Sequence, residues 1–178
     1  MLDKLIDVVL QFARELLPFE VIDHYDRGVR LRFGRAVMEG DKVKILEPGF
    51  HWKWPLADSI NTHMVKVTTM DLTEQTVTTK DGQSVVVRAV LKYEVNDVAT
   101  LLLEVDGPAA AVADMSMGIL RDAFVEKMWS ECNDPEFPQQ ITSRIRREAK
   151  KWGIYVVQLT LTDLALMRSI RLLTKHNL

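Results

Sequence analysis

The chain has 178 residues, a formal net charge of −2 and 47% hydrophobic residues, which is typical of a globular protein with one domain or two small lobes. Because the net charge is close to zero, the composition gives no argument for nucleic acid binding. A single cysteine, Cys132, excludes a disulfide framework and a cysteine metal cluster, and we expect it to be a small buried apolar residue.

The first residues predict an amphipathic helix. Wound at about 100° per residue, positions 1–18 place their polar side chains within an arc of roughly 120°, and apolar side chains fill the rest. Such a helix is too short and too charged to cross a bilayer, so we expect it to lie in the membrane interface. The alternative is packing on the domain's own core or on another subunit. The residues expected to contact lipid are Leu2, Leu5, Ile6, Val9, Phe12 and Leu16.

Strand patterns follow after Pro18. Val29, Leu31 and Phe33 alternate with arginines, which is the period-2 pattern of a half-buried strand. Further on, Asp81–Gly82 is a hairpin signal between two more apolar runs. We therefore expect an antiparallel β lobe over residues 20–95, with strands at 28–34, 61–72 and 85–95.

The second half of the chain changes to helical periodicity. Asp97 is placed to cap a short helix, and Gly153 is placed to end the last one. A strand over 154–161 and a tail over 163–178, which we expect to form a short helix, complete the chain. The helices so predicted cover about 98–105, 108–132 and, after Pro135, up to Trp152.

Six segments together resemble the SPFH domain, also called band 7, of stomatins, prohibitins and flotillins. Their order and spacing carry the resemblance, which covers residues 20–162. The segments are 25–29 (YDRGV), 33–35 (FGR), 46–55 (LEPGFHWKWP), 77–82 (VTTKDG), 118–124 (GILRDAF) and 152–156 (WGIYV).

The resemblance implies an α+β fold in which an antiparallel β-rich lobe precedes an α/β lobe. It implies membrane attachment at the N-terminus, homo-oligomerisation, scaffolding of membrane microdomains, restraint of membrane proteases or channels, and no catalysis or cofactor. We expect an amphipathic helix over 1–18, the SPFH domain over 19–162 with its second lobe over 96–162, and a tail over 163–178. About fifteen residues follow the last strand without a heptad run. The sequence therefore does not favour the large closed cage that the family's coiled coil implies, and a smaller ring or a curved array stays open.

The aromatic run after Pro48–Gly49 has two interpretations. Phe50, Trp52 and Trp54 alternate, and aromatic residues at period 2 most often fill a β core. Tryptophan is also enriched at membrane interfaces, so the same residues fit a membrane-touching loop. On the second interpretation, Phe19, Trp52 and Trp54 join the lipid-contacting set.

Charged side chains suggest a subunit contact. A basic stretch over 144–151 follows a helix with acidic residues near its end. The simple explanation of this pattern is two solvated helix faces. The functional alternative is a head-to-tail contact between copies. Nucleic acid binding is not favoured, because no aromatic side chains alternate with these charges. The contact residues on the functional alternative are Asp122, Glu126, Arg144, Arg147 and Lys151.

The sequence contains no pattern that indicates catalysis or metal binding. The four histidines lack metal-ligand spacing, and no serine lies in a Gly-x-Ser-x-Gly elbow. We therefore expect a non-enzymatic, membrane-associated scaffold on a cytoplasmic face, which organises a membrane patch or restrains a membrane protein partner. The alternatives are a soluble structural or virion assembly protein and an inhibitory adaptor of a membrane protease.

Overall fold

The structure, a computed structural model, describes residues 17–167 as two compact units. The first, which we call the β unit, contains the described residues up to Thr68, together with Glu94–Pro108 and Ala149–Tyr155. The second, the α/β unit, contains Thr69–Tyr93, Ala109–Glu148 and the described residues from Val156 onward. The predicted α+β fold is confirmed, whereas the predicted N-terminal helix lies outside the described residues.

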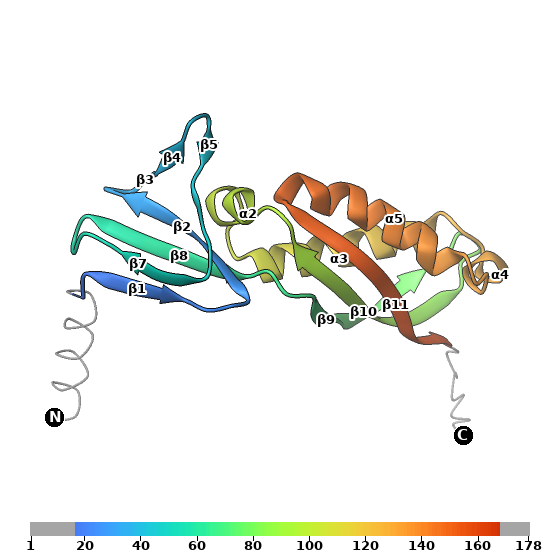
Figure 1. The fold of residues 1–178 in the computed structure, drawn as a ribbon. Helices are drawn as coiled ribbons and strands as arrows, with labels where there is room; N and C mark the ends of the chain where they lie inside the picture. Colours follow the sequence, from blue (N-terminus) through green and yellow to red (C-terminus); the bar gives the residue numbers. More distant parts are fainter. Residues whose placement is uncertain (1–16, 168–178) are drawn as a thin grey trace, which may run out of the picture. The chain divides into compact units, whose positions relative to one another are not determined.

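The β unit consists of short antiparallel strands (Figure 1). β2 (Asp26–Arg32) is the centre of one sheet and pairs with β3 (Arg35–Ala36), β6 (Ile45–Leu46) and β8 (Asp58–Met64). β1 (Phe19–Ile22) pairs with β7 (Gly49–Trp52) in a two-stranded sheet, and β4 (Met38–Glu39) pairs with β5 (Lys42–Val43). Val29, which the sequence placed inside, is fully buried.

The helix α2 (Val98–Glu104) belongs to the β unit and is fixed at its start by two neighbours. The Asp97 side chain accepts a hydrogen bond from Thr100 N at 3.1 Å, which confirms the predicted N-cap. The carbonyl of Gly153 accepts hydrogen bonds from the backbone N–H groups of Asn96 and Asp97. Gly153 has the left-handed φ of 73° that the sequence position predicted for the end of the preceding helix.

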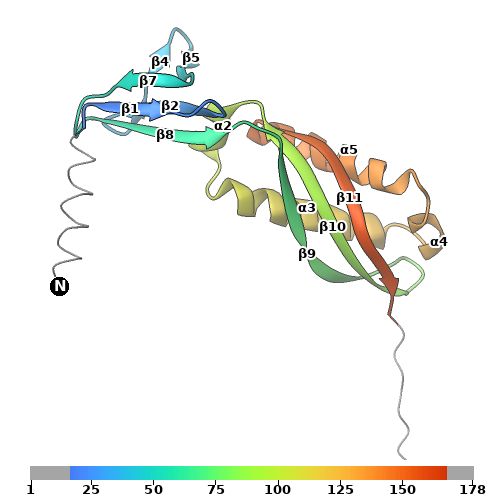
Figure 2. The same ribbon diagram turned by 60° about the horizontal axis from the view of Figure 1, so that its bottom comes forward.

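The α/β unit is built on a three-stranded sheet covered on one face by helices (Figures 1 and 2). β10 (Ser84–Val95) lies between β9 (Thr68–Thr78) and β11 (Ile154–Leu166). Alternate residues of β10 are buried, and they face the apolar sides of α3 (Pro108–Val125) and α5 (Phe137–Ala149). The core of this unit includes Val85, Val87, Leu91, Val112, Leu120, Phe124, Ile141 and Ile145.

Three elements differ from the sequence-based expectations. The strands at 68–95, which were expected in the first lobe, instead form a sheet with β11. This pairing joins residues far apart in the chain, so no local pattern predicts it. The helix expected over 108–132 ends at Val125, and α4 (Trp129–Cys132) is separate. The β9–β10 turn draws the chain out of the helix there, since Lys80 N donates to Lys127 O at 2.9 Å. Residues 163–166, expected to be helical, continue β11.

Side chains of α5 form hydrogen bonds with backbone groups of the edge strand β11. The Arg146 guanidinium donates to the carbonyls of Val156 and Val157 at 2.8 and 2.9 Å. Thr142 Oγ1 accepts a hydrogen bond from Leu159 N at 3.0 Å and donates to the carbonyl of Pro138 in its own helix. These contacts tie α5 to the start of β11 and give these backbone groups hydrogen-bond partners on the helix.

Candidate functional site

One face of the β1–β7 sheet is apolar and open to solvent. The register places Phe19 opposite Trp52 and Val21 opposite Phe50, so all four side chains share this face. Their exposed fractions are 37% for Phe19, 58% for Trp52, and 63% for both Val21 and Phe50. The Phe19 and Phe50 rings stack with centroids 5.2 Å apart. We call these four residues the apolar face.

The opposite face of the same two strands is turned into the protein. Ile22 is 3% exposed, and the Lys53 ammonium forms an ion pair with Glu20 at 2.6 Å. Because the sheet already has one inner face, the apolar face is not part of the core. The interpretation of Phe50 and Trp52 as core residues is therefore wrong, whereas the prediction that they lie on one face is confirmed.

Trp54, also expected at a membrane, lies in the loop between β7 and β8 and is 63% exposed. The loop is closed by Asp58, whose backbone N–H donates to Trp54 O at 2.9 Å. Lys53 N donates to Pro18 O at 2.8 Å, so the loop adjoins the point at which the chain enters the described residues. The residue before Trp54 thus contacts Pro18, near the first described residue. The six predicted lipid-contacting residues from Leu2 to Leu16 lie outside the described part.

The charged residues expected at a subunit contact gather mainly between α3 and α5. Arg144 Nη2 lies 2.7 Å from Glu126 Oε2, and this contact lowers the pKa of Glu126 below its ordinary value. Asp122, Arg147 and Glu148 line the same groove, whereas Lys151 lies in the 3-10 turn after α5. Both partners of the ion pair are about half exposed, so the pair adds little to stability.

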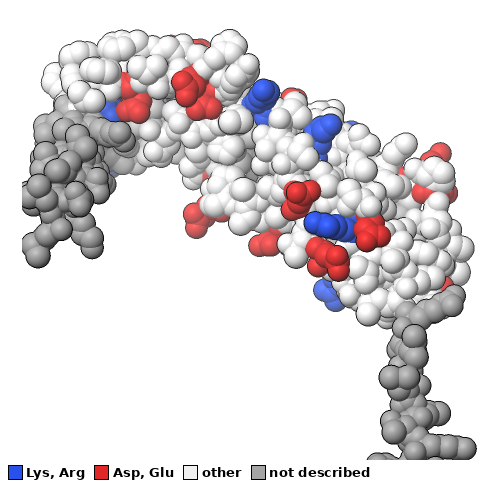
Figure 3. All heavy atoms as spheres, turned by 90° about the horizontal axis from the view of Figure 1, so that it is seen from below, with Lys and Arg blue, Asp and Glu red and all other residues white. Residues whose placement is uncertain are grey.

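The arrangement mixes the two signs of charge on one surface. Figure 3 shows acidic and basic side chains interspersed, without an extended area of one sign, on the face that it displays. One of the two interpretations of the sequence placed the acidic and basic groups on separate patches, each facing another copy. Within one chain, Glu126, directly after α3, and Arg144 of α5 form an ion pair with each other.

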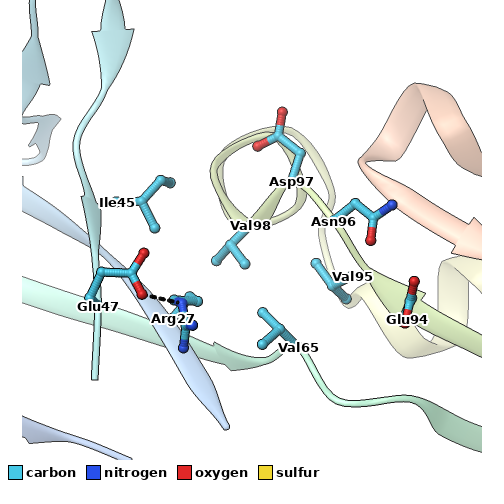
Figure 4. A pocket seen from close by; sticks show the side chains of 9 residues that line it. All are labelled: Arg27, Ile45, Glu47, Val65, Glu94, Val95, Asn96, Asp97 and Val98. Carbon is cyan, nitrogen blue, oxygen red and sulfur yellow. Dashed lines mark ion pairs between the residues drawn. The ribbon is translucent and has the colours of Figure 1, made fainter. Parts of the chain in front are cut away.

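A shallow pocket lies in the β unit (Figure 4). Val98 and Val65 point into it, and the ion pair between Arg27 and Glu47, 2.7 Å long, forms one side. Its lining contains no serine, cysteine, histidine or lysine, and its charged residues are Arg27 and the carboxylates Glu47, Glu94 and Asp97. Since Arg27 is already neutralised by Glu47, we do not place a ligand site there.

Within residues 17–167, no helix combines the length and hydropathy needed to cross a bilayer. In the same range, no group of three or more histidine, cysteine, aspartate or glutamate residues is arranged to hold a metal ion.

The two-unit α+β fold, with β-rich strands first and a helix-covered sheet second, agrees with a family comparison. The model of the SPFH domain / Band 7 family matches residues 20–171. This chain belongs to that family. The sequence resemblance over residues 20–162 is therefore confirmed.

Several SPFH proteins are similar to this chain. Protein HflC of Vibrio cholerae is 29% identical over 136 residues, which cover 76% of this chain and 41% of that protein. A band 7 family protein of Acanthamoeba polyphaga mimivirus is 24% identical over 155 residues, covering 86% and 49%. Modulator of FtsH protease HflC of Escherichia coli is 27% identical over 112 residues, covering 62% and 33%. The chain thus spans less than half the length of these relatives.

Sequence reasoning missed the exposure of Val21, Phe33 and Leu56 in this SPFH protein. Val21 alternates with Phe19, so the period-2 pattern could have placed it on the apolar face. Phe33 was expected inside the β2 strand but is 79% exposed in the turn that follows. Leu56, in the loop after β7, is 83% exposed and had no signal beyond its position next to Pro55.

Proposed function

We propose that this SPFH protein is an oligomeric scaffold at the cytoplasmic face of a membrane, where it organises a membrane patch or restrains a membrane protein partner. The observation that carries the proposal is the apolar face of β1 and β7, which adjoins the start of the described chain. Tryptophan suits the membrane–water interface because its indole combines an apolar body with a polar N–H, and the phenylalanine and valine side chains add apolar area for burial. The preceding amphipathic segment would supply the deeper anchor.

Vesicle flotation tests the membrane contact with the full chain. The double variant Phe50→Glu/Trp52→Glu should lower binding to lipid vesicles by about tenfold or more, because it places charges where lipid contact is expected. A matched control, Met38→Glu/Met64→Glu, alters two other exposed apolar residues of the β unit and should bind like the unaltered chain. Equal binding of all three proteins would overturn the contact through the apolar face.

The N-terminal segment separates the scaffold from the soluble alternative. Leu5→Asp combined with Val9→Asp should release the protein from vesicles while leaving its oligomeric mass unchanged in light scattering. In a soluble structural or virion assembly protein, the same change would dissociate the oligomer without any lipid effect. Multivalency makes the distinction measurable, since several weak helices in one assembly bind far more firmly than one.

The groove between α3 and α5 is our proposed contact between copies. Because it carries both signs of charge, two copies can place Asp122 against Arg147 in both directions, which is an isologous contact. Asp122→Arg or Arg147→Asp alone should lower the oligomeric mass, and an equimolar mixture of the two variants should restore it. A ring or array then requires a second surface. No change in mass with either single variant would contradict a contact through this groove.

Inhibition of a membrane protease is the second candidate function. It is favoured by the name of the Escherichia coli relative, which describes a modulator of FtsH protease. If the chain acts in this way, an FtsH-type protease in the same vesicles should degrade a membrane substrate more slowly when the full chain is present. The scaffold proposal alone requires no change in the degradation rate.

A further inference from the structure

Two turns meet at one end of the β unit. The first, Phe33–Gly34, joins β2 to β3, and the second, residues 53–57, joins β7 to β8. Phe33 N donates to Ala57 O at 2.8 Å, which ties one turn to the other. Figures 1 and 2 show that β1 and β8 begin at this same end. We call the Phe33–Gly34 turn and residues 53–57 together the double turn.

The double turn holds bulky apolar residues in a conformation that does not suit them. Phe33 has φ 48° and Leu56 has φ 65°, and they are the two non-glycine residues with positive φ in residues 17–167. The left-handed region favours glycine, asparagine and aspartate, and it is a genuine outlier for a bulky side chain. Backbone strain of this kind is concentrated at functional sites, where the surrounding structure maintains it.

The same two residues are the most exposed large apolar side chains of the described chain. Leu56 is 83% exposed and Phe33 is 79% exposed. Their side chains therefore gain almost nothing from the interior of the β unit, although asparagine at either position would relieve both the strain and the apolar exposure. A contact with an apolar partner outside the β unit would account for Phe33 and Leu56 at these positions.

A buried carboxylate maintains the conformation of both turns. Asp58, whose side chain is fully buried, accepts hydrogen bonds from Arg32 Nε at 2.7 Å and from Arg32 Nη2 at 3.1 Å. It also accepts a hydrogen bond from Trp54 N at 3.2 Å. Since Arg32 directly precedes the first turn and Asp58 directly follows the second, this one carboxylate fixes the bases of both. Phe33 and Leu56, at the tips of the two turns, are thus held in position before they contact a partner.

The chemistry at this end of the β unit selects a lipid bilayer as the partner. Trp54 lies in the second turn, between Trp52 of the apolar face and Leu56 along the chain, and is 63% exposed. The amphipathic N-terminal segment joins the described chain here, since Pro18 O accepts from Lys53 N. The Lys53 ammonium is paired with Glu20, so this lysine contributes little attraction to anionic headgroups. Apolar burial would drive the contact, which a bilayer of any headgroup charge can supply.

We propose that Phe33, Trp54 and Leu56 form an apolar wedge that inserts into the lipid bilayer beside the N-terminal segment. The wedge deepens the proposed membrane function and rests on it. Each copy would then contact the bilayer through the apolar face and through the double turn, in addition to the predicted N-terminal helix. Contacts at separate places on the β unit fix its orientation to the membrane plane, which one helix at the end of a chain does not.

The test is the full-chain variant Phe33→Asn/Leu56→Asn, measured by sedimentation with neutral phosphatidylcholine vesicles. Asparagine tolerates positive φ, so the fold and thermal stability should be kept or improved, and circular dichroism verifies this. Removing two apolar side chains from the bilayer should weaken binding by about tenfold or more. The control, Tyr25→Asn/Met38→Asn, changes two exposed residues outside the double turn and should bind normally.

The outcomes separate this proposal from the function on which it rests. If the double-turn variant binds as tightly as the unaltered chain while Leu5→Asp/Val9→Asp releases the protein, the wedge is refuted and the membrane function stands. If the unaltered chain does not bind vesicles, both fail. If the double-turn variant changes only the oligomeric mass, the tips contact another copy, and the lipid proposal is overturned.

Discussion

The substitution Gly153→Ala tests how closely the backbone at Gly153 approaches Asp97 in the β unit. Gly153 has φ 73°, and a Cβ placed there would press on Asp97 O and lie 2.8 Å from Asp97 Cβ. The left-handed conformation costs an alanine about 1–2 kcal/mol. The contact with backbone adds about 1–3 kcal/mol, as for an overpacked core, because neither atom lies at the end of a flexible side chain. We therefore expect a loss of roughly 2–5 kcal/mol in the free energy of unfolding.

Gly82→Ala is the matched control for this loss. Gly82 has nearly the same φ, 76°, but a Cβ there meets nothing within 4 Å. Urea unfolding followed by tryptophan fluorescence and circular dichroism should therefore show a loss of about 1–2 kcal/mol for Gly82→Ala and a distinctly larger loss for Gly153→Ala. Equal losses in the two variants would refute the argument from close contact and leave backbone conformation as the whole effect.

Three further predictions concern single side chains. The hydrogen bond from Arg32 lowers the pKa of Asp58. The ionised Asp58 therefore stabilises the fold above its unfolded pKa of about 4, and this stabilisation is lost as the pH falls through the lower folded pKa. In an acid titration, the free energy of unfolding should decline less steeply for Asp58→Asn than for the unaltered chain. Thr142→Val should cost about 1–3 kcal/mol in urea unfolding, because it leaves the buried Leu159 N–H without its acceptor. Burial raises the pKa of Cys132 to about 11, so iodoacetamide at pH 8 should label it only after denaturation; rapid labelling of the folded chain would disprove its burial.

Local patterns predicted much of this fold because they depend on neighbouring residues. Asp97 caps its helix, Gly153 ends another, and Asp81–Gly82 turns between β9 and β10, each as its residue type requires. The partner of the β9–β10 hairpin could not be predicted in this way. Its pairing with β11 depends on contacts between distant parts of the chain, which leave no periodic signal.

The candidate site was predictable in part for a related reason. Period-2 alternation shows that Phe50 and Trp52 share a face, but it does not show whether that face is covered. Phe33 continued the alternation of Val29, yet it occupies a turn because Gly34 follows it and allows a two-residue hairpin. A glycine directly after an apolar strand residue is the signal that could have placed Phe33 outside.

The hydrogen bonds from α5 to β11 also have a consequence for aggregation. An edge strand with unpaired backbone groups is a template to which another chain can add a strand, and repeated addition at both edges builds fibrils. Arg146 and Thr142 occupy the template positions between Val156 and Leu159, so strand addition is blocked along that stretch. Along that stretch β11 is less available for strand addition than the opposite edge of the sheet, β9. The helix that covers this sheet therefore also limits how far the sheet can grow.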